Sequence, residues 1–485
     1  MLLFLVLDSP FRSEIKVSNY SMSSCMQNTE TDVKKVGNTV LVTWIRGDGS
    51  QYAGNYLAMS FDGGNTFAGN IRYTSPNSNC WIGDPAIAIQ PDNPNILFFA
   101  GMIYCNPNNT KGEVYFCRCA SGSGCTTASN WSCSTLGPND NWAYFKDKPW
   151  LLAIGNNTIL ANFTTDKFGG YNLVIYKSTD NGNTWTQVGY TNWPSTVGYW
   201  AKDGSNIYMS YNDFSQSNNG IIYVGFLRST NSGSSFQFIA ETGFSFGSNT
   251  TCPNYQRPAK IHDHITASNG KVAISYVDGN CKARVAVWTG GSTLKTYPIA
   301  SSGGGTQQIL PMLASSGDKI FAQWQGRISS YSSCSPFTLG TWATYWAISN
   351  NWGQSFSAPQ RVSSVNYPFS ENPLGHDYNG WIVDNGKIYT SWANDYRDGN
   401  TGDTYYSYTS TTTLSVLEEI INKEKPYSIK YQTNKVIISS KVPFTIYRAN
   451  GEKLISYKEG NYQLNLKSGI YFIKSNNFED KIIIR

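Results

Sequence analysis

The chain has 485 residues, of which 40% are hydrophobic and 14% are charged, and its formal net charge at pH 7 is +5. A chain of this size and apolar content can bury a large core, which excludes an unfolded linker. The positive charge is concentrated at one end, because residues 414–485 hold 12 Lys and Arg against 7 Asp and Glu, whereas the rest of the chain holds 25 of each. The long N-terminal part is therefore neutral and lacks the basic face expected of a nucleic-acid-binding protein.

The N-terminal segment MLLFLVLDSPFRS carries a short apolar run with no basic residue before it and no small-residue cleavage site after it. We interpret residues 1–27 as a lead-in that combines a truncated export signal with a short strand, SEIKVSNY. This strand is predicted to pair with the last of the repeats described below and to close them into a ring. A plain extended lead-in is the alternative. No other stretch approaches the ~20 apolar residues of a membrane-spanning helix.

Residues 28–412 repeat one arrangement of short strands. Each repeat contains a run with period-two alternation that is entered through an Asn, Asp or Gly turn. These runs read NTVLVTW, NILFFAG, NTILANF, NIYMSY, GKVAISY, DKIFAQW and GKIYTSW. One strand precedes each run and two follow it, and the seven repeats begin near residues 29, 83, 147, 198, 258, 309 and 375. Their spacing of about fifty to sixty-five residues exceeds the usual propeller period of about 40–50 residues.

A second pattern joins the last two strands of four repeats. It reads MSFDGGNTF, KSTDNGNTW, RSTNSGSSF and ISNNWGQSF. In two copies the acid is replaced by Asn. A catalytic carboxylate could not be replaced in this way. A turn tolerates the exchange, because Asp and Asn side chains both bond to nearby backbone N–H groups. The pattern therefore predicts structural turns. The shared positions are Ser60, Asp62, Gly64, Phe67, Ser178, Asp180, Gly182, Trp185, Ser229, Asn231, Gly233, Phe236, Ser349, Asn351, Gly353 and Phe356.

Four-stranded units repeated around an axis are typical of a β-propeller. We therefore predict an all-β protein with a seven-bladed β-propeller over residues 28–412. A six-bladed propeller is the alternative. Beyond residue 412 the composition changes, because Lys becomes frequent and Trp disappears. The alternation in residues 413–485 predicts a small C-terminal β-sandwich as a separate domain.

The repeated turn resembles the Asp-box, or bacterial neuraminidase (BNR) repeat, of sialidases and related propellers. The segments GDPAIAI, residues 83–89, and GHDYNGWIVDNGKIYTSWANDYRDG, residues 375–399, resemble blade openings in the same proteins. The resemblance covers residues 25–410 and implies the architecture rather than an activity, because hydrolases, lyases and non-catalytic binders share the Asp-box. Known sialidases have six blades, so a count of seven departs from that family.

The C-terminal segment resembles the sorting domain of proteins exported by the bacterial type IX secretion system. The matching features are the hairpin YRANGEKL, the strand LKSGIYFIK and a Lys followed by β-branched residues at the end of the chain. This resemblance implies the secretion and sorting machinery as a partner, removal of the tail, and a secreted or outer-membrane-surface location in a Gram-negative bacterium. An ordinary immunoglobulin-like accessory domain is the alternative.

The chain has ten cysteines, and five of them, Cys105, Cys117, Cys119, Cys125 and Cys133, fall in one repeat. Their spacing matches no common zinc pattern. Disulfides are expected in an exported protein. Cys252 and Cys281 flank the inner strands of one repeat and form a candidate pair.

A sialidase site needs an arginine triad for a carboxylate, a Tyr nucleophile with a Glu beside it, and an Asp as acid/base. No such triad can be assembled here, and the Arg-Ile-Pro motif of the sialidase domain is absent. Polar residues where the innermost strands begin are the alternative candidates, because propeller ligands bind at the mouth of the channel. The candidate catalytic residues are Asp84, Asp377, Tyr378 and Arg257, and the candidate ligand-binding residues are Glu30, Lys148, His262, His264 and His376. Such groups could instead cap strands and bond neighbouring blades.

The sequence predicts no cofactor, although Asp395, Asp398 and Asp403 are candidate oxygen ligands for Ca²⁺. A solvated hairpin loop is the alternative interpretation of this stretch. The sequence thus predicts an exported propeller that binds glycans or another surface ligand, with hydrolysis as a further candidate activity, no transmembrane segment and no nucleic-acid partner. A non-enzymatic adhesin or protein-interaction scaffold is the competing class.

Overall fold

The structure is a computed structural model of the whole chain. It describes residues 15–18, 28–47, 52–73, 80–104, 111–137, 143–245, 263–300, 303–334, 337–363, 367–370, 379–393 and 404–410 of the first unit. In the second unit it describes residues 427–432, 435–440, 443–448, 452–458, 460–464, 469–475 and 478–484. The two units are Met1–Thr412 and Thr413–Arg485.

The first three sheets of the first unit follow one another along the chain, and each has four antiparallel strands. Blade 1 contains β2 (Asn28–Val36), β3 (Thr39–Gly47), β4 (Tyr52–Ser60) and β5 (Ala68–Tyr73). Blade 2 contains β6 (Trp81–Ile89), β7 (Leu97–Tyr104), β8 (Gly112–Cys119) and β9 (Ser132–Thr135), with the short helices η1 (Gly122–Thr126) and η2 (Ala128–Asn130). Blade 3 contains β10 (Lys146–Gly155), β11 (Thr158–Thr165), β12 (Asn172–Ser178) and β13 (Thr186–Tyr190).

The next three sheets repeat this order. Blade 4 contains β14 (Trp200–Asp203), β15 (Asn206–Asp213), β16 (Ile221–Ser229) and β17 (Gln237–Ser245), with η3 (Ser217–Asn219). Blade 5 contains β18 (Ile265–Ser268), β19 (Lys271–Val277), β20 (Ala283–Trp288) and β21 (Lys295–Pro298). Blade 6 contains β22 (Gln308–Ser316), β23 (Lys319–Cys334), β24 (Phe337–Ser349), β25 (Gln360–Arg361) and β26 (Tyr367–Ser370).

Blade 7 joins the two ends of the first unit. It contains β27 (Gly380–Asp384), β28 (Lys387–Ala393), β29 (Thr404–Ser410) and, as its outermost strand, the N-terminal β1 (Ile15–Lys16). Ile15 pairs with Tyr406, and the Val17 N–H donates to the Thr404 carbonyl at 2.9 Å. A strand from the start of the chain therefore completes the last sheet and closes the ring.

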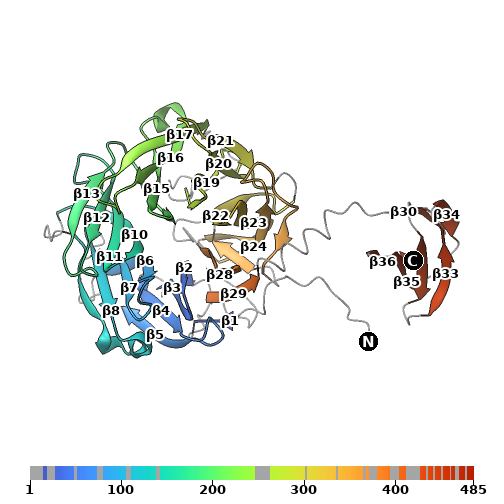
Figure 1. The fold of residues 1–485 in the computed structure, drawn as a ribbon, viewed down its shortest axis with the longest axis horizontal. Coiled ribbons are helices and arrows are strands. Elements are labelled where there is room, and N and C mark those ends of the chain that lie inside the picture. Colours follow the sequence, from blue (N-terminus) through green and yellow to red (C-terminus); the bar gives the residue numbers. More distant parts are fainter. Residues whose placement is uncertain are drawn as a thin grey trace. The chain divides into compact units, whose positions relative to one another are not determined.

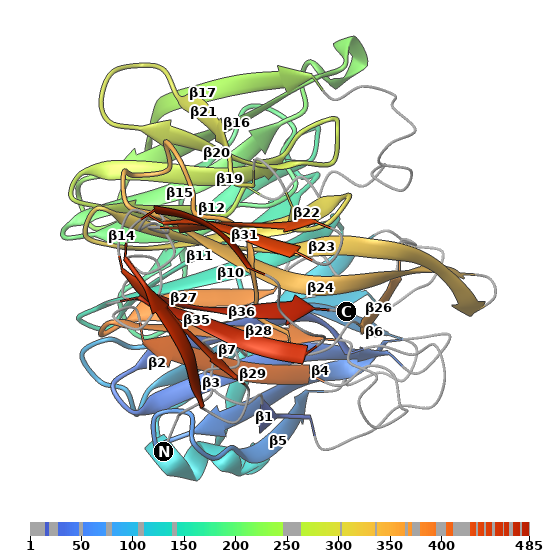
Figure 2. The same ribbon diagram turned by 90° about the vertical axis from the view of Figure 1, so that its right-hand side faces the viewer.

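Seen down its short axis, the first unit is a ring of sheets in which β2, β6 and β22 lie near the centre and β5, β13 and β17 lie at the rim (Figure 1). This is the seven-bladed β-propeller that the repeats predict, and the six-bladed alternative is wrong. Figure 2 views the ring from its edge and shows that the long hairpin β23–β24 of blade 6 extends beyond the neighbouring strands.

The core lies between blades. Middle strands are buried on both faces, as in β11, where all eight residues are buried. Apolar clusters accordingly join neighbouring sheets. One cluster joins blades 2 and 3 through Phe98, Phe116, Ile159 and Phe163. Burial of both faces explains why the middle strands read as nearly continuous apolar runs rather than as strict alternation.

The four repeated turns share one hydrogen-bond pattern. In each, the Ser hydroxyl accepts the Gly N–H, at 2.9 Å for Ser60 and 2.7 Å for Ser178. In the Asp copies the Thr hydroxyl donates to the carboxylate, as Thr184 does to Asp180 at 2.6 Å. In the Asn copies the amide donates to a Ser hydroxyl instead, as Asn231 does to Ser235 at 2.9 Å. The exchange of acid for amide therefore only reverses the direction of one hydrogen bond.

Each of these turns packs against the preceding blade, and this contact explains why all four copies have glycine at the same position. Gly233 of blade 4 has a φ of +76° and a Cβ there would lie 2.6 Å from Leu160 of blade 3. Gly353 of blade 6 has a φ of +81° and a Cβ would lie 2.9 Å from Val287 of blade 5. A side chain at these positions would both strain the backbone and push the blades apart.

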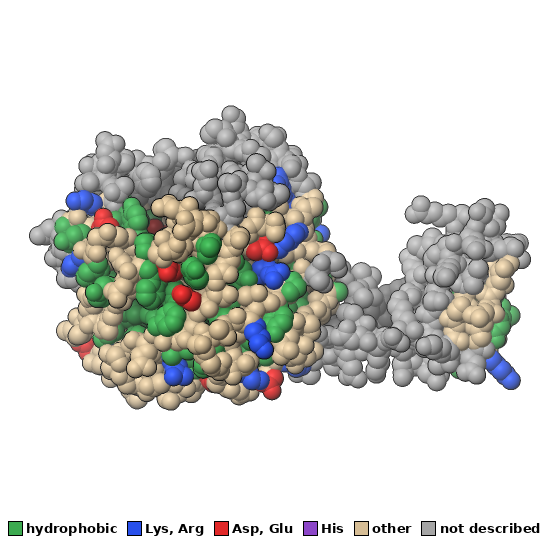
Figure 3. All heavy atoms as spheres, turned by 90° about the horizontal axis from the view of Figure 1, so that it is seen from above, with side chains coloured by type: hydrophobic (Ala, Val, Ile, Leu, Met, Phe, Trp, Pro, Cys, Tyr) green, Lys and Arg blue, Asp and Glu red, His purple; other side chains and the backbone are tan. Residues whose placement is uncertain are grey.

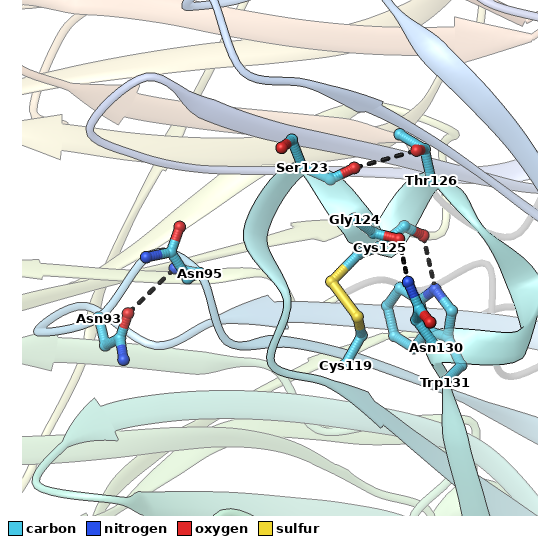
Figure 4. Close-up of a disulfide and its surroundings, with 9 residues drawn as sticks. All are labelled: Asn93, Asn95, Cys119, Ser123, Gly124, Cys125, Thr126, Asn130 and Trp131. Atoms are coloured by element: carbon cyan, nitrogen blue, oxygen red, sulfur yellow. Dashed lines mark hydrogen bonds between the residues drawn. A yellow bond between two sulfur atoms is a disulfide. The ribbon is translucent and has the colours of Figure 1, made fainter.

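Two disulfides fasten the outer edge of blade 2. Cys117 and Cys133 are paired across β8 and β9, and Cys119 joins Cys125 in η1. Figure 4 shows the second disulfide, beside which the Trp131 indole N–H donates to the Cys125 carbonyl at 2.8 Å.

The remaining cysteine predictions are only partly within the described residues. Cys80 and Cys281 are disulfide-bonded. Cys252, the predicted partner of Cys281, lies outside the described residues, as does Cys105.

The second unit contains two antiparallel sheets. One has β30 (Tyr427–Gln432), β31 (Lys435–Ser440) and β34 (Gly460–Leu464), and the other has β33 (Lys453–Tyr457), β32 (Phe444–Arg448), β35 (Gly469–Ser475) and β36 (Phe478–Ile484). Ile438 and Leu464 of the first sheet pack with Phe444, Ile446 and Ile473 of the second. The shared core between two sheets is that of a small β-sandwich.

Candidate functional site

Antiparallel pairing places the repeated turns and the predicted site at opposite ends of the ring. In each blade the first and third strands run in the same direction, away from the end of the ring where the innermost strand begins. The turn that follows the third strand therefore lies at the far end, where the Gly63 N–H also donates to the Asn38 carbonyl of the first hairpin at 2.9 Å. The end where the innermost strands begin is the mouth considered below.

A β-bulge recurs near the start of four innermost strands. The register shifts fall between Thr29 and Asp32, Gly83 and Ala86, Asp147 and Trp150, and Ile309 and Met312. The first of the two residues within each bulge has a positive φ, which is uncommon for a residue other than Gly. These residues are Glu30 (φ 54°), Asp84 (φ 47°), Lys148 (φ 49°) and Leu310 (φ 51°). Bulges re-aim a side chain, so three consecutive blades turn a charged group the same way.

The three charged bulge residues meet. Lys148 Nζ lies 3.0 Å from Asp84 Oδ1 and 3.9 Å from Glu30 Oε1. All three side chains are buried, with at most 9% of any of them exposed. One ammonium from blade 3 therefore compensates carboxylates from blades 1 and 2. The structure brings together three of the residues predicted from sequence, and the contact fastens three blades, as the strand-capping alternative requires.

The charges also set the protonation of Asp84. Burial alone would raise the pKa of this carboxyl, but the charge of the Lys148 ammonium and its hydrogen bond to Asp84 hold that pKa well below its usual value. Asp84 is therefore an anion at any physiological pH. Asp147, half-buried next to Lys148, accepts the Lys148 N–H at 3.0 Å and is the more accessible carboxylate of this cluster.

A second buried ion pair lies next to the first. Lys146 Nζ contacts Glu113 Oε2, and both side chains are buried. The Tyr104 hydroxyl donates to the Lys146 carbonyl at 2.7 Å. Burial, together with the charges of Asp147 and Asp84, raises the pKa of Tyr104 well above its ordinary value. Tyr104, Glu113 and Lys146 were not predicted as site residues from the sequence. The segment KDKP, in which two lysines flank an acid before a proline, is the signal that could have indicated Lys146.

Blade 5 contributes a different kind of carboxyl. Asp263 is completely buried, and burial raises its pKa to about 7. The Ser210 hydroxyl lies close enough to oppose that rise in part, but it donates to the Tyr199 carbonyl at 3.4 Å, and neither Asp263 oxygen has a hydrogen-bond partner among the described residues. The neighbouring His264 accepts the Leu313 N–H through Nδ1 at 3.1 Å. His264 is thus tied to blade 6 rather than to the cluster around Lys148.

The other predicted site residues cannot be placed. Asp377, Tyr378, Arg257, His262, His376, Asp395, Asp398 and Asp403 lie outside the described residues. Within the part of the chain that the structure describes, no group of three or more His, Cys, Asp or Glu side chains could hold a metal ion.

Charge on the outer surface is mixed. Figure 3 shows one side of the molecule, on which Lys and Arg side chains are scattered among acidic, polar and apolar ones and form no continuous basic face. None of the helices in the described segments is long and apolar enough to cross a membrane.

The fold of the first unit places it in the class of seven-bladed β-propellers. No protein-family model matches the sequence, and neither does any curated protein. Among solved structures, polysaccharide lyase Uly1 is similar over 83% of this chain and 99% of its own, with 10% identity and a TM-score of 0.49.

Two further solved structures are similar to this chain. A mutant of Trypanosoma rangeli sialidase with trans-sialidase activity is similar over 98% of this chain and 87% of its own, with 8% identity and a TM-score of 0.46. Penicillium chrysogenum α-L-arabinanase in complex with arabinobiose is similar over 83% of this chain and 99% of its own, with 12% identity and a TM-score of 0.43. Identities of this size concern the fold alone.

Proposed function

We propose that this protein is an exported propeller that binds glycans at the end of the ring where the innermost strands begin. The observation that carries the proposal is the concentration of ionisable groups there, with Asp147 and Tyr104 partly accessible above the buried pair of Asp84 and Lys148. Sugar hydroxyls both donate and accept hydrogen bonds. The Asp147 carboxylate and the oxygen of the Tyr104 phenol, whose own O–H donates to the Lys146 carbonyl, accept hydrogen bonds from such hydroxyls.

In this proposal the residues have separate tasks. Asp147 and Tyr104 contact the ligand. Asp84, Glu30 and Lys148 are positioning residues, because their buried ion pairs fix the three blades that carry the contacting groups. Because the buried ion pairs already hold the contacting residues in place, less conformational entropy is lost when a ligand binds.

Binding of the full chain to an array of neutral, uronate-containing and sialylated oligosaccharides tests this proposal. We expect at least one series to bind, and Asp147→Asn to weaken that binding about tenfold, the loss of one hydrogen bond to a charged group. The matched control is Asp318→Asn, which changes an exposed carboxylate at the far end of the ring. Absence of binding by the folded protein would favour the adhesin or protein-interaction scaffold instead.

Hydrolysis is a second candidate function, because Asp147 is a partly exposed carboxylate at the mouth that can reach a bound sugar, as the acid/base of a glycosidase must. Mass spectrometry of sugars released from the bound series tests this activity. Sugar release by the wild-type protein that Asp147→Asn abolishes would establish this activity, whereas binding without release leaves a glycan-binding protein.

Export and sorting belong to the same proposal. Disulfides such as that between Cys119 and Cys125 are typical of proteins that fold in an oxidising compartment. The second unit is a compact sandwich suited to serve as a separate sorting signal. Fusing residues 413–485 to a reporter in a bacterium with type IX secretion tests this role. Delivery of the reporter to the surface or the medium supports sorting, and retention in the periplasm contradicts it.

A further inference from the structure

The hairpin turn between β11 and β12 presents aromatic rings to solvent. It reads DKFGGY, in which Phe168 is 38% exposed and Tyr171 is 50% exposed. Tyr190, the last residue of β13, is 48% exposed and stacks on Phe168 with ring centroids 4.6 Å apart. A tight turn requires residues such as Gly, Asp or Asn and makes no use of aromatic side chains. Phe168, Tyr171 and Tyr190 are called the blade 3 platform below.

The platform is a local concentration of exposed aromatic surface. Among the residues whose side-chain burial the structure describes, the one other exposed aromatic side chain is Phe238 of blade 4, at 50%. Aromatic rings normally dominate cores because they bury much surface, so exposed rings that gather in one place indicate a binding surface. Gly169, within the turn, has a φ of +86° and no atom within 4 Å of where a Cβ would lie, so open space adjoins the rings.

Ring contacts connect the platform to the charged cluster. Tyr104, whose hydroxyl bonds to the Lys146 carbonyl, lies 5.9 Å from the ring of Phe145. Phe145 in turn makes an edge contact with Tyr171 at 5.1 Å. The Phe145 N–H donates to Asp166 Oδ1 at 2.8 Å, which ties the aromatic turn to the start of blade 3. The platform is therefore held in a fixed position beside the proposed binding site.

We infer that the blade 3 platform is an extended subsite for a carbohydrate chain, so that the preferred ligand is an oligosaccharide rather than a single terminal sugar. This inference rests on the proposed function. The apolar C–H face of a sugar ring covers an aromatic ring while its hydroxyls stay in water, which suits rings that are half exposed. One sugar residue over Asp147 and Tyr104 leaves Tyr171 and Tyr190 uncovered, whereas a chain continues across them.

The test compares monosaccharides, disaccharides and tetrasaccharides of the same neutral, uronate-containing and sialylated series, with affinity measured by calorimetry on the full chain. We expect tetrasaccharides to bind at least tenfold more tightly than the corresponding monosaccharide. Tyr171→Ala and Tyr190→Ala should each remove about tenfold of tetrasaccharide affinity and leave monosaccharide affinity unchanged. Tyr190→Phe keeps the ring and should retain the affinity.

Phe238→Ala is the matched control, because it removes an equally exposed ring from another blade and should change nothing. Equal affinity for all lengths, or tetrasaccharide affinity unaffected by Tyr171→Ala, would overturn the platform while leaving the proposed function intact. Failure of the wild-type protein to bind any member of the series would overturn both. The near-ultraviolet circular dichroism of each variant shows whether it has folded.

Discussion

Lys148 Nζ lies 3.0 Å from Asp84 Oδ1, and the two residues occupy the same bulge position in neighbouring blades. A repeated backbone irregularity thus brings opposite charges from different sheets into contact at the mouth. The pair is buried, and Glu30 from a third blade shares the same ammonium at 3.9 Å.

Lys148→Met should be strongly destabilising. It leaves the Asp84 and Glu30 carboxylates buried without their cation, and breaking a buried pair in this way costs about 3–5 kcal/mol. Urea denaturation at pH 7 measures the loss. The control is Lys271→Met, which breaks the exposed Lys271–Asp318 pair and should cost little, because solvent screens it. Equal losses for the two variants would contradict a supporting role for the cluster.

Asp263 should make the protein less stable as pH rises. Its folded pKa of about 7 is above the unfolded value of about 4, so the folded state binds more protons in between. The stability it contributes is complete below about pH 4 and is lost as pH rises towards 7. Asp263→Asn should therefore leave stability at pH 4 unchanged and raise it by roughly 4 kcal/mol at pH 8. If the unfolding free energies of the wild-type protein and Asp263→Asn depended on pH in the same way, the raised pKa of Asp263 would be refuted.

The repeated turns should tolerate an amide but not an apolar residue. Asp180→Asn keeps a polar group that can bond the Thr184 hydroxyl, as Asn231 bonds Ser235, so we expect little change in unfolding free energy at pH 7. Asp180→Ala removes these bonds and should cost about 1 kcal/mol. Thermal unfolding of the two variants measures the difference, and an equal loss for both would sink the interpretation.

The same carboxylate should also contribute to acid sensitivity. Hydrogen bonds from Ser178 and Thr184 outweigh desolvation and lower the pKa of Asp180 to about 2. The stability that Asp180 contributes is therefore present above about pH 4, its unfolded pKa, and is lost as pH falls towards 2. Asp180→Asn should flatten the stability profile in this window alone. An unchanged profile would show that the exposed carboxylate is screened by solvent.

Gly233→Ala should separate blades 3 and 4. The substitution places a methyl group at a φ of +76° and against Leu160, so we expect a loss of about 2–4 kcal/mol from backbone strain and overpacking together. Gly204→Ala is the control, because its φ of +59° imposes strain but no atom lies within 4 Å of the new methyl group. Equal losses in chemical denaturation would mean that strain alone acts at Gly233.

Much of the architecture was predictable from local patterns. Period-two alternation and turn residues located the strands, and the fourfold recurrence of turns such as KSTDNGNTW indicated structure rather than catalysis. Glu30, Asp84 and Lys148 were recognised as polar residues at strand starts. Their mutual contact was not, because nothing in the 117 residues that separate Glu30 from Lys148 specifies how three strand starts converge.

The properties of Tyr104, Glu113 and Asp263 also could not be predicted from the sequence. Tyr104 and Glu113 lie in strands that read as ordinary and Asp263 is a polar residue at a strand start, and the character of each depends on what the neighbouring blade places beside it. The pKa of Asp263 rises because the fold buries it with no hydrogen-bond partner among the described residues, and the pKa of Asp84 falls because Lys148 arrives from blade 3.

The sequence by itself determined the strands, the turns and the count of seven blades, because these depend on alternation and backbone preferences within a few residues. Only the tertiary structure decided which charges meet, which rings remain exposed and which carboxyl is buried alone. Those properties arise from closing the ring, which brings Ile15 beside Tyr406 and juxtaposes side chains that the chain keeps far apart.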